Sequence, residues 1–212
     1  MTLSQRLGAL TNHGTEWVLW LLVALSILSL GVAIERAVLF WMSRDDVVGL
    51  RNRLRQALGR GELAAARRVL DDSPSFEARI ARAGLDADST ASAEERMRGE
   101  AELARLGMER HLSLLGTLGN NAPFIGLLGT VIGIVRAFRE LEHARGQISE
   151  GLMTEVGEAL VATAVGILIA LPAVAFFNLY QRVIRTRLGR AEALVREVLA
   201  LRKASAVPEA AE

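Results

Sequence analysis

The chain has 212 residues, of which 51% are hydrophobic and 23% charged, and such a combination requires the two classes to be segregated along the chain. Its 25 lysines and arginines nearly balance 24 aspartates and glutamates, so no strong positive field would draw it to nucleic acid. It has no cysteine, which excludes disulfides, thiol catalysis and cysteine-ligated zinc, and its three histidines lie far apart, so no metal site and no cofactor are expected.

The first apolar segment, residues 17–34, has 18 residues without a charge and is long enough to cross a bilayer. Trp17 and Trp41 bracket it and would lie about 36 Å apart on a helix, close to the distance between the two membrane interfaces. The segment is too long for the apolar region of a signal peptide. The sequence therefore predicts an N-terminal segment (1–16) and a first transmembrane helix (17–42), with Glu35 and Arg36 as an interfacial pair.

Residues 43–111 are rich in charge and contain no apolar stretch that could cross a bilayer, so we expect a soluble helical insertion. Within it, apolar residues at helical spacing precede Gly59, a short helix follows from Glu62 to Leu70, and Ser73 with Pro74 suits the start of another.

A capping-box pair, Ser92 and Glu95, precedes an apolar stripe that continues into the second apolar segment, residues 112–136. The pattern predicts one helix of about 45 residues, bent at Pro123. A loop (137–155) and a third transmembrane helix (156–180), which contains Pro172, come next. An amphipathic helix and tail (181–212) end the chain.

Arginines cluster after the first and third apolar segments. By the positive-inside rule, the insertion and the C-terminus are expected to be cytoplasmic, and the N-terminus and the loop to be periplasmic. The sequence thus predicts an all-α integral membrane protein with three transmembrane helices, two of them extended into long cytoplasmic helices, and a small helical cytoplasmic insertion.

Residues 122–134 (APFIGLLGTVIGI) and 157–172 (GEALVATAVGILIALP) are unusual for helices that face only lipid. Gly126, Gly129 and Gly133 would let another helix approach closely, and helix packing alone is one interpretation of them. Thr130 and Thr163 lie among small residues. Each hydroxyl could bond to its own helix, or the two could line a narrow wet passage.

Glu158 is the strongest functional signal in these segments. A carboxylate inside a membrane helix costs roughly 2.5 to 3.5 kcal/mol and is expected to face a bundle interior or a water-filled cavity. The alternative is a residue close enough to the outer surface to reach the interface, since Glu155 precedes it by one turn. Glu158 and Thr163 differ by about 140° of rotation on a straight helix, so they cannot point at one axis.

Taken together, these two segments and the IERAVLF run (34–40) resemble the ExbB/TolQ branch of the MotA/TolQ/ExbB proton-channel family over residues 17–200. The resemblance implies an inner-membrane homopentamer that surrounds two copies of a single-span, ExbD/TolR-like partner and uses the proton motive force for mechanical work on the cell envelope. The family's pore threonines fall on Thr130 and Thr163, and its third-helix glutamate falls on Glu158. Glu155 stands where the family commonly has glycine.

Two other classes of function compete with this one, a membrane enzyme and a structural ring. A membrane enzyme would need clustered acid, base and nucleophile groups, whereas the membrane carboxylate here stands nearly alone, so no enzymatic activity is expected. A purely structural ring without proton conduction would explain the apolar stripes but not Glu158 or the threonines.

Overall fold

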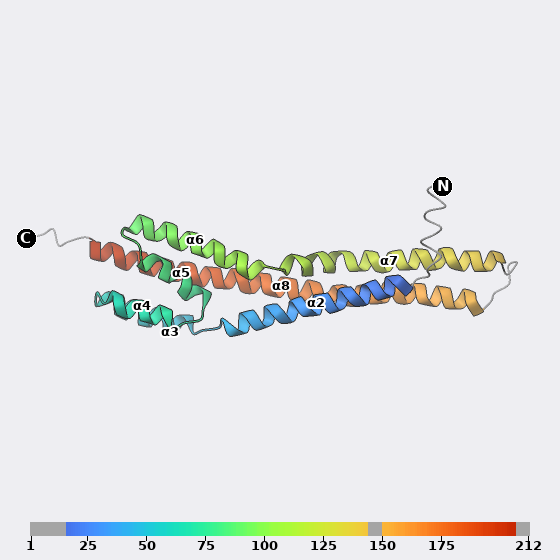
Figure 1. Ribbon diagram of the computed structural model, residues 1–212, viewed down its shortest axis with the longest axis horizontal. Coiled ribbons are helices and arrows are strands. Elements are labelled where there is room, and N and C mark those ends of the chain that lie inside the picture. The colour runs from blue at the N-terminus through green and yellow to red at the C-terminus, as the bar shows by residue number, and fades with distance from the viewer. Residues whose placement is uncertain (1–15, 144–149, 207–212) are drawn as a thin grey trace, which may run out of the picture. The chain divides into compact units, whose positions relative to one another are not determined.

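The computed structural model describes residues 16–143 and 150–206, which form two compact units. Almost all of these residues are helical (Figure 1). The helices are α2 (Glu16–Met42), α3 (Val47–Gly59), α4 (Leu63–Asp71), α5 (Phe76–Leu85), α6 (Thr90–Glu109), α7 (Leu112–His143) and α8 (Glu150–Ala206). Three segments, which contain α2, α7 and most of α8, are long and apolar enough to cross a membrane. The predicted all-α fold with three spans is confirmed.

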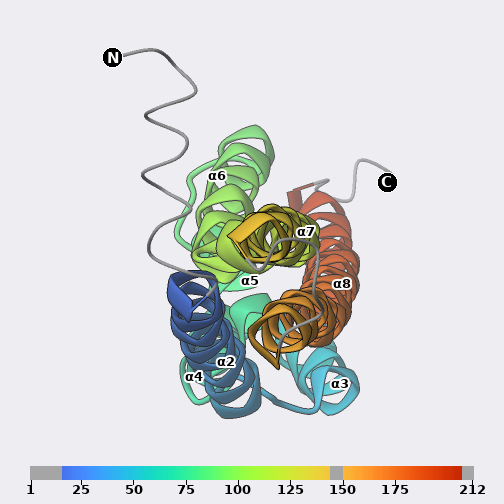
Figure 2. The same cartoon turned by 90° about the vertical axis from the view of Figure 1, so that its right-hand side faces the viewer.

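The first unit comprises residues 16–34, 111–143 and 150–178. In it α7 runs beside the first part of α8, as both views show (Figures 1 and 2). Residues from all three helices meet in its core: Val18, Leu22, Ala122, Ile132, Ile169 and Ala170. Other large apolar side chains point outward, and Trp20, Phe124 and Leu168 are each about 70% exposed. Such a surface suits lipid or another transmembrane chain.

The second unit comprises residues 35–110 and 179–206, which contain the end of α2, the helices α3 to α6 and the last part of α8. Serine side chains cap two of the short helices: Ser75 accepts from the backbone N–H of Ala78, and Ser89 accepts from that of Ser92. The sequence placed the N-cap of α5 at Ser73, two residues too early, and that of α6 at Ser92, three residues too late. Ser75 and Ser89 both have the extended backbone that suits an N-cap residue.

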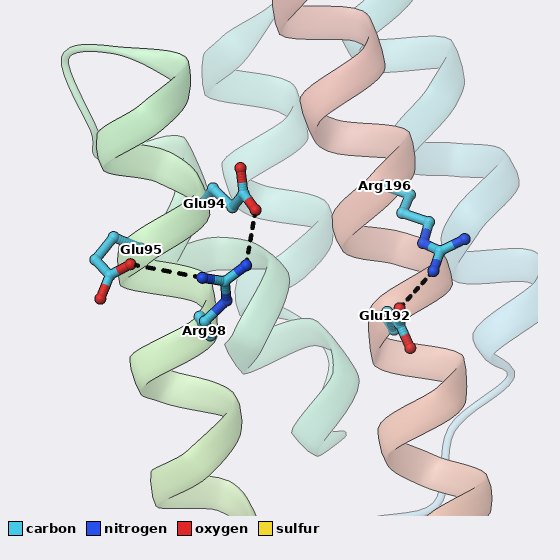
Figure 3. A network of polar contacts seen from close by, with 5 residues as sticks. All are labelled: Glu94, Glu95, Arg98, Glu192 and Arg196. Carbon is cyan, nitrogen blue, oxygen red and sulfur yellow. Dashed lines mark hydrogen bonds and ion pairs between the residues drawn. The ribbon is translucent and has the colours of Figure 1, made fainter.

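Ion pairs one turn apart line the exposed faces of α6 and of the last part of α8 (Figure 3). Arg98 pairs with Glu94 at 3.0 Å and with Glu95 at 4.0 Å, and Arg196 pairs with Glu192 at 2.5 Å. Pairs of this kind stabilise a helix by only about 0.3–0.5 kcal/mol each. These ion pairs therefore contribute little to the stability of the fold, and they keep the exposed faces of the two helices polar.

The predicted unbroken helix from the insertion into the second span is wrong. α6 ends at Glu109, His111 adopts a positive φ of 61°, and α7 begins at Leu112. The buried Arg36 side chain donates to the free carbonyls of Gly107 (3.0 Å) and Met108 (3.4 Å) at the end of α6, while Glu35 pairs with it at 2.6 Å. The apolar stripe continues across the break, so periodicity could not reveal it.

A second buried arginine holds the end of α2. Arg187 donates to the carbonyl of Phe40 (2.7 Å) and to the carbonyl (2.9 Å) and hydroxyl (2.8 Å) of Ser43. Its guanidinium group also lies over the rings of Phe40 and Phe76, 5.5 and 5.7 Å from their centroids. Charge-assisted donors thus satisfy helix-end carbonyls that have no partner within α2.

The connection between the second and third spans is shorter than predicted, because α7 extends to His143 and α8 begins at Glu150. Residues 144–149 lie outside the described residues, as does almost all of the predicted N-terminal segment. Pro123 and Pro172 lie inside α7 and α8, and both helices continue through them. Membrane helices tolerate such prolines, because neighbouring groups satisfy the backbone carbonyls that a proline leaves without a partner.

Candidate functional site

The candidate site lies in the first unit, where α7 and α8 approach each other along a line of small residues. A Cβ atom added to Gly126 would lie 2.7 Å from the carbonyl oxygen of Ala162 and 3.0 Å from the Cα of Thr163. One added to Gly133 would lie 2.5 Å from the Cβ of Ala159. Since these atoms belong to backbone or to a short side chain, neither position has room for alanine at the observed helix spacing.

Gly129 serves two contacts at once. A Cβ atom there would lie 2.7 Å from the Cβ of Ala162 on α8 and 3.2 Å from Val18 on α2. All three glycines singled out in the sequence therefore lie at helix contacts, as the packing interpretation requires.

Two further glycines belong to this contact and were missed in the sequence. A Cβ atom on Gly166 would lie 2.7 Å from the carbonyl of Ala122, and one on Gly119 would lie 3.1 Å from the backbone nitrogen of Val174. Spacing could have revealed them, because small residues recur every three or four positions along both helices. The α7 positions are 119, 122, 126, 129 and 133, and those on α8 include 159, 162 and 166.

The close approach brings Thr130 and Thr163 into direct contact, and their hydroxyl groups share a hydrogen bond. The Thr130 hydroxyl also lies 3.3 Å from the Gly126 carbonyl on its own helix and 3.2 Å from the Ala159 carbonyl on α8. The Thr163 hydroxyl lies 3.2 Å from the Gly126 carbonyl across the helix contact. Both side chains are half-buried.

This cluster has four oxygen atoms but only two hydrogen atoms to share among them. Each hydroxyl can donate once and accept twice, whereas the carbonyls only accept. One arrangement has Thr130 donating to the hydroxyl of Thr163 and Thr163 donating to the carbonyl of Gly126, so that each hydroxyl keeps at least one lone pair for an incoming O–H group. The cluster can therefore accept a hydrogen bond from water or from a carboxylic acid, and it can switch donors without any ionisation.

Glu158 lies on α8, five residues before Thr163 and roughly 7.5 Å away along the helix axis. Its side chain is half-buried. The hydroxyl cluster does not include it: the hydrogen bonds of Thr130 and Thr163 within the described residues go to each other and to the carbonyls of Gly126 and Ala159. The structure thus joins the two threonines directly and places the carboxylate toward the loop end of the same helix pair.

A charged pair that the sequence did not reveal lies farther toward the loop. Arg136 on α7 pairs with Glu155 on α8 at 2.9 Å, and the side chains are 31% and 19% exposed. The second carboxylate oxygen of Glu155 is buried and has no hydrogen-bond partner within the described residues. Antiparallel pairing about a short connection, with Gly133 against the carbonyl of Glu155, would have placed these two residues opposite each other. The negative charge that Glu155 brings to the loop end of the helix pair is therefore balanced by Arg136.

Comparison with known proteins supports a family assignment for this arrangement. A model of the MotA/TolQ/ExbB proton channel family matches residues 72–193. An ExbB-like biopolymer transport protein of Helicobacter pylori is 46% identical over 77 residues, which cover 36% of this chain and 51% of the relative. The Tol-Pal system protein TolQ of Pseudomonas aeruginosa is 32% identical over 114 residues, 50% of this chain and 47% of the relative.

A longer alignment extends to the biopolymer transport protein ExbB of Pseudomonas putida. It is 25% identical over 178 residues, 76% of this chain and 54% of the relative. The chain spans about half the length of these curated relatives.

Proposed function

Because this chain belongs to the MotA/TolQ/ExbB proton channel family, we propose that it is the channel subunit of an inner-membrane motor that couples the proton motive force to mechanical work on the cell envelope. The hydroxyl cluster of Thr130 and Thr163 carries this proposal. The cluster is a polar group between two membrane helices. The small residues beside it let those helices approach closely.

A proton that crosses the membrane must traverse about 30 Å of hydrocarbon. Glu158 is the carboxylate available within the α7 and α8 spans, and no other acid follows it before Glu192 on α8. The threonine hydroxyls do not ionise near neutral pH, so they position a proton carrier rather than act as one. The carrier therefore has to come from outside this chain.

We propose that the carrier is a carboxylic acid on the single transmembrane helix of an ExbD/TolR-like partner. Its O–H group would donate to the hydroxyl cluster when the partner helix faces this subunit, and Glu158 would exchange the proton with the outer side. A homopentamer around two partner helices would present five such clusters in turn. In this arrangement the N-terminus and the α7–α8 connection are periplasmic, and the second unit and the C-terminus are cytoplasmic.

Proton flux through the complex tests the proposal. The protein co-purified with its partner and reconstituted in vesicles should conduct protons, and Thr163→Val, a near-isosteric loss of the hydroxyl, should lower the flux roughly tenfold, as expected for one lost hydrogen bond in the rate-limiting state. Thr130→Val and Glu158→Gln should act in the same direction. Thr117→Val is the control, since Thr117 lies exposed on α7, outside the cluster.

If the protein were only a structural scaffold, the same samples should give the opposite result for proton flux. A structural ring without conduction would show no proton flux in the wild type with its partner, and Thr163→Val would alter neither flux nor assembly. Undiminished flux in Thr163→Val, with the complex intact, would remove that residue from the proton pathway.

A further inference from the structure

The second unit contains a cavity of about 560 Å³ that the proton pathway does not use. It lies between the end of α2, the start of α5 and the part of α8 that follows Leu179. These are the turns at which the apolar segments of α2 and α8 give way to charged sequence. If the spans cross the membrane as proposed, the cavity lies at the level of the lipid headgroups.

Part of the cavity lining is strongly basic. Arg44, Arg182 and Arg190 line it, all three are exposed, and none has an ion-pair partner within the described residues. Arg187 also lines the cavity, but its donors are occupied by the backbone of Phe40 and Ser43. Three guanidinium groups, two on α8 and one in the connection after α2, are therefore free to bind an anion.

Other lining residues are apolar or aromatic. Leu179 and Val183 of α8 line it together with Phe40 and Trp41 of α2, and Trp41 is 72% exposed. Tryptophan prefers the depth at which acyl chains meet headgroups. The lining thus combines basic with apolar and aromatic side chains, and this combination matches a phosphodiester carrying acyl chains rather than a small soluble anion.

The two acidic groups of the cavity weaken its positive charge only in part. Asp45 accepts hydrogen bonds from its neighbour's backbone N–H and from Ser73. Glu77 is only 2% exposed, and one of its carboxylate oxygens has no hydrogen-bond partner within the described residues. Four arginines therefore face two acids, of which one is satisfied by its own neighbours.

We propose that this cavity binds the headgroup of an anionic phospholipid, with the phosphate on Arg44, Arg182 and Arg190 and the acyl chains along Trp41, Leu179 and Val183. The lipid would bridge α2 and α8 where they leave the membrane. Basic pockets between helices at this level commonly select anionic over zwitterionic headgroups. The inference does not depend on proton conduction, so it stands or falls separately from the proposed function.

Native mass spectrometry of the full-length, delipidated protein in detergent tests the site. With equal amounts of phosphatidylglycerol and phosphatidylcholine added, the wild type should retain phosphatidylglycerol selectively. Arg182→Gln and Arg190→Gln should each lower its retention about fivefold, the factor expected for one basic residue near an anionic lipid. Arg44→Gln, which follows the end of α2, should do the same without any change in α8.

Arg185→Gln is the matched control, because Arg185 lies on the same part of α8, is exposed and does not line the cavity. Retention lowered equally in Arg185→Gln would mean that surface charge alone attracts the lipid and would overturn the site. Equal retention of phosphatidylcholine would overturn it as well. Displacement of phosphatidylglycerol by millimolar inorganic phosphate would show that the cavity binds a free anion and would refute the lipid assignment.

Discussion

Two buried arginines perform the same task at different places in the second unit. Arg36 donates to carbonyls at the end of α6, and Arg187 donates to carbonyls at the end of α2. Each guanidinium group satisfies acceptors that would otherwise be buried without partners, at the cost of its own dehydration. Burial lowers the pKa of Arg187, although the nearby carboxylate of Glu77 opposes this effect. Both residues should therefore matter far more for stability than the surface ion pairs.

Replacing Arg187 tests this directly. Arg187→Gln removes a charge-assisted donor to Phe40 and Ser43 and should lower the free energy of unfolding by about 3 kcal/mol. Arg187→Lys should recover only part of the loss, because an ammonium group cannot reproduce the forked donors or the stacking on Phe40 and Phe76. Thermal unfolding in detergent measures both, with the exposed Arg185→Gln as control. Equal midpoints for Arg187→Gln and Arg185→Gln would contradict the capping role.

Glu77 should make stability depend on pH. Burial raises the pKa of its carboxyl group above the usual 4.5, against the lowering effects of its backbone hydrogen bond, Arg187 and Arg190 and with a smaller raising effect from Asp45. The folded protein therefore binds this proton more tightly than the unfolded chain does. Its contribution to stability is complete below pH 4.5 and is lost as the pH rises through the raised pKa.

Glu77→Gln, which mimics the protonated form, should therefore raise the unfolding temperature at pH 8, by about 2–4 °C for each kcal/mol recovered. The gain over the wild type should shrink toward pH 5. Thermal unfolding at both values measures the difference, and Glu95→Gln, at an exposed position on α6, is the control. A Glu77→Gln variant that is less stable than the wild type at pH 8 would show that the ionised carboxylate is favourable in the fold.

At the scale of single elements, the contact between α7 and α8 depends on the absence of side chains at specific positions. Gly126 faces backbone atoms of α8, which cannot move aside as a flexible side chain could. Gly157 lies on α8 itself and has nothing within 4 Å of the position that a Cβ atom would occupy. The two glycines are thus chemically identical but differ in surroundings.

Gly126→Ala should push the helices apart and lengthen the bonds of the hydroxyl cluster, with a cost of roughly 1–3 kcal/mol from overpacking. Gly157→Ala should be neutral or slightly stabilising, since alanine favours helix by up to about 1 kcal/mol over glycine. Thermal unfolding of both variants in the same detergent measures the contrast. Similar midpoints for the two would mean that α7 and α8 do not require the close approach.

The sequence predicted the elements better than their ends. Long apolar runs made the three spans evident, and the sequence singled out Gly126, Gly129 and Gly133 as positions where helices could approach closely. The break at Arg110 and His111 was missed, because it depends on a distant side chain, Arg36, which no local pattern reports.

The candidate site was predicted in part. The sequence named both threonines, but whether they meet depends on the register of α7 against α8, and Gly126 and Gly133 set that register only once the pairing is known. The pair of Arg136 and Glu155 was missed for the same reason.

At the scale of the whole molecule, the direction in which the chain crosses the membrane is the property most open to a direct test. The chain has no cysteine, so single cysteines can be introduced without background. His143→Cys, at the exposed end of α7, should react with a membrane-impermeant thiol reagent in intact cells. Asp88→Cys, exposed between α5 and α6, should react only after the membrane is opened. The reverse labelling would invert the proposed topology.

The unbroken course of α8 has a mechanical consequence. Thr163 and Arg187 lie on this one helix of 57 residues, 24 positions apart in the sequence. A turn of α8 about its own axis that parted the threonine hydroxyls would also swing Arg187 away from Phe40 and Ser43, unless the helix took up the torsion between them. The bonds of the buried guanidinium group thus oppose rotation of this part of α8 about its own axis.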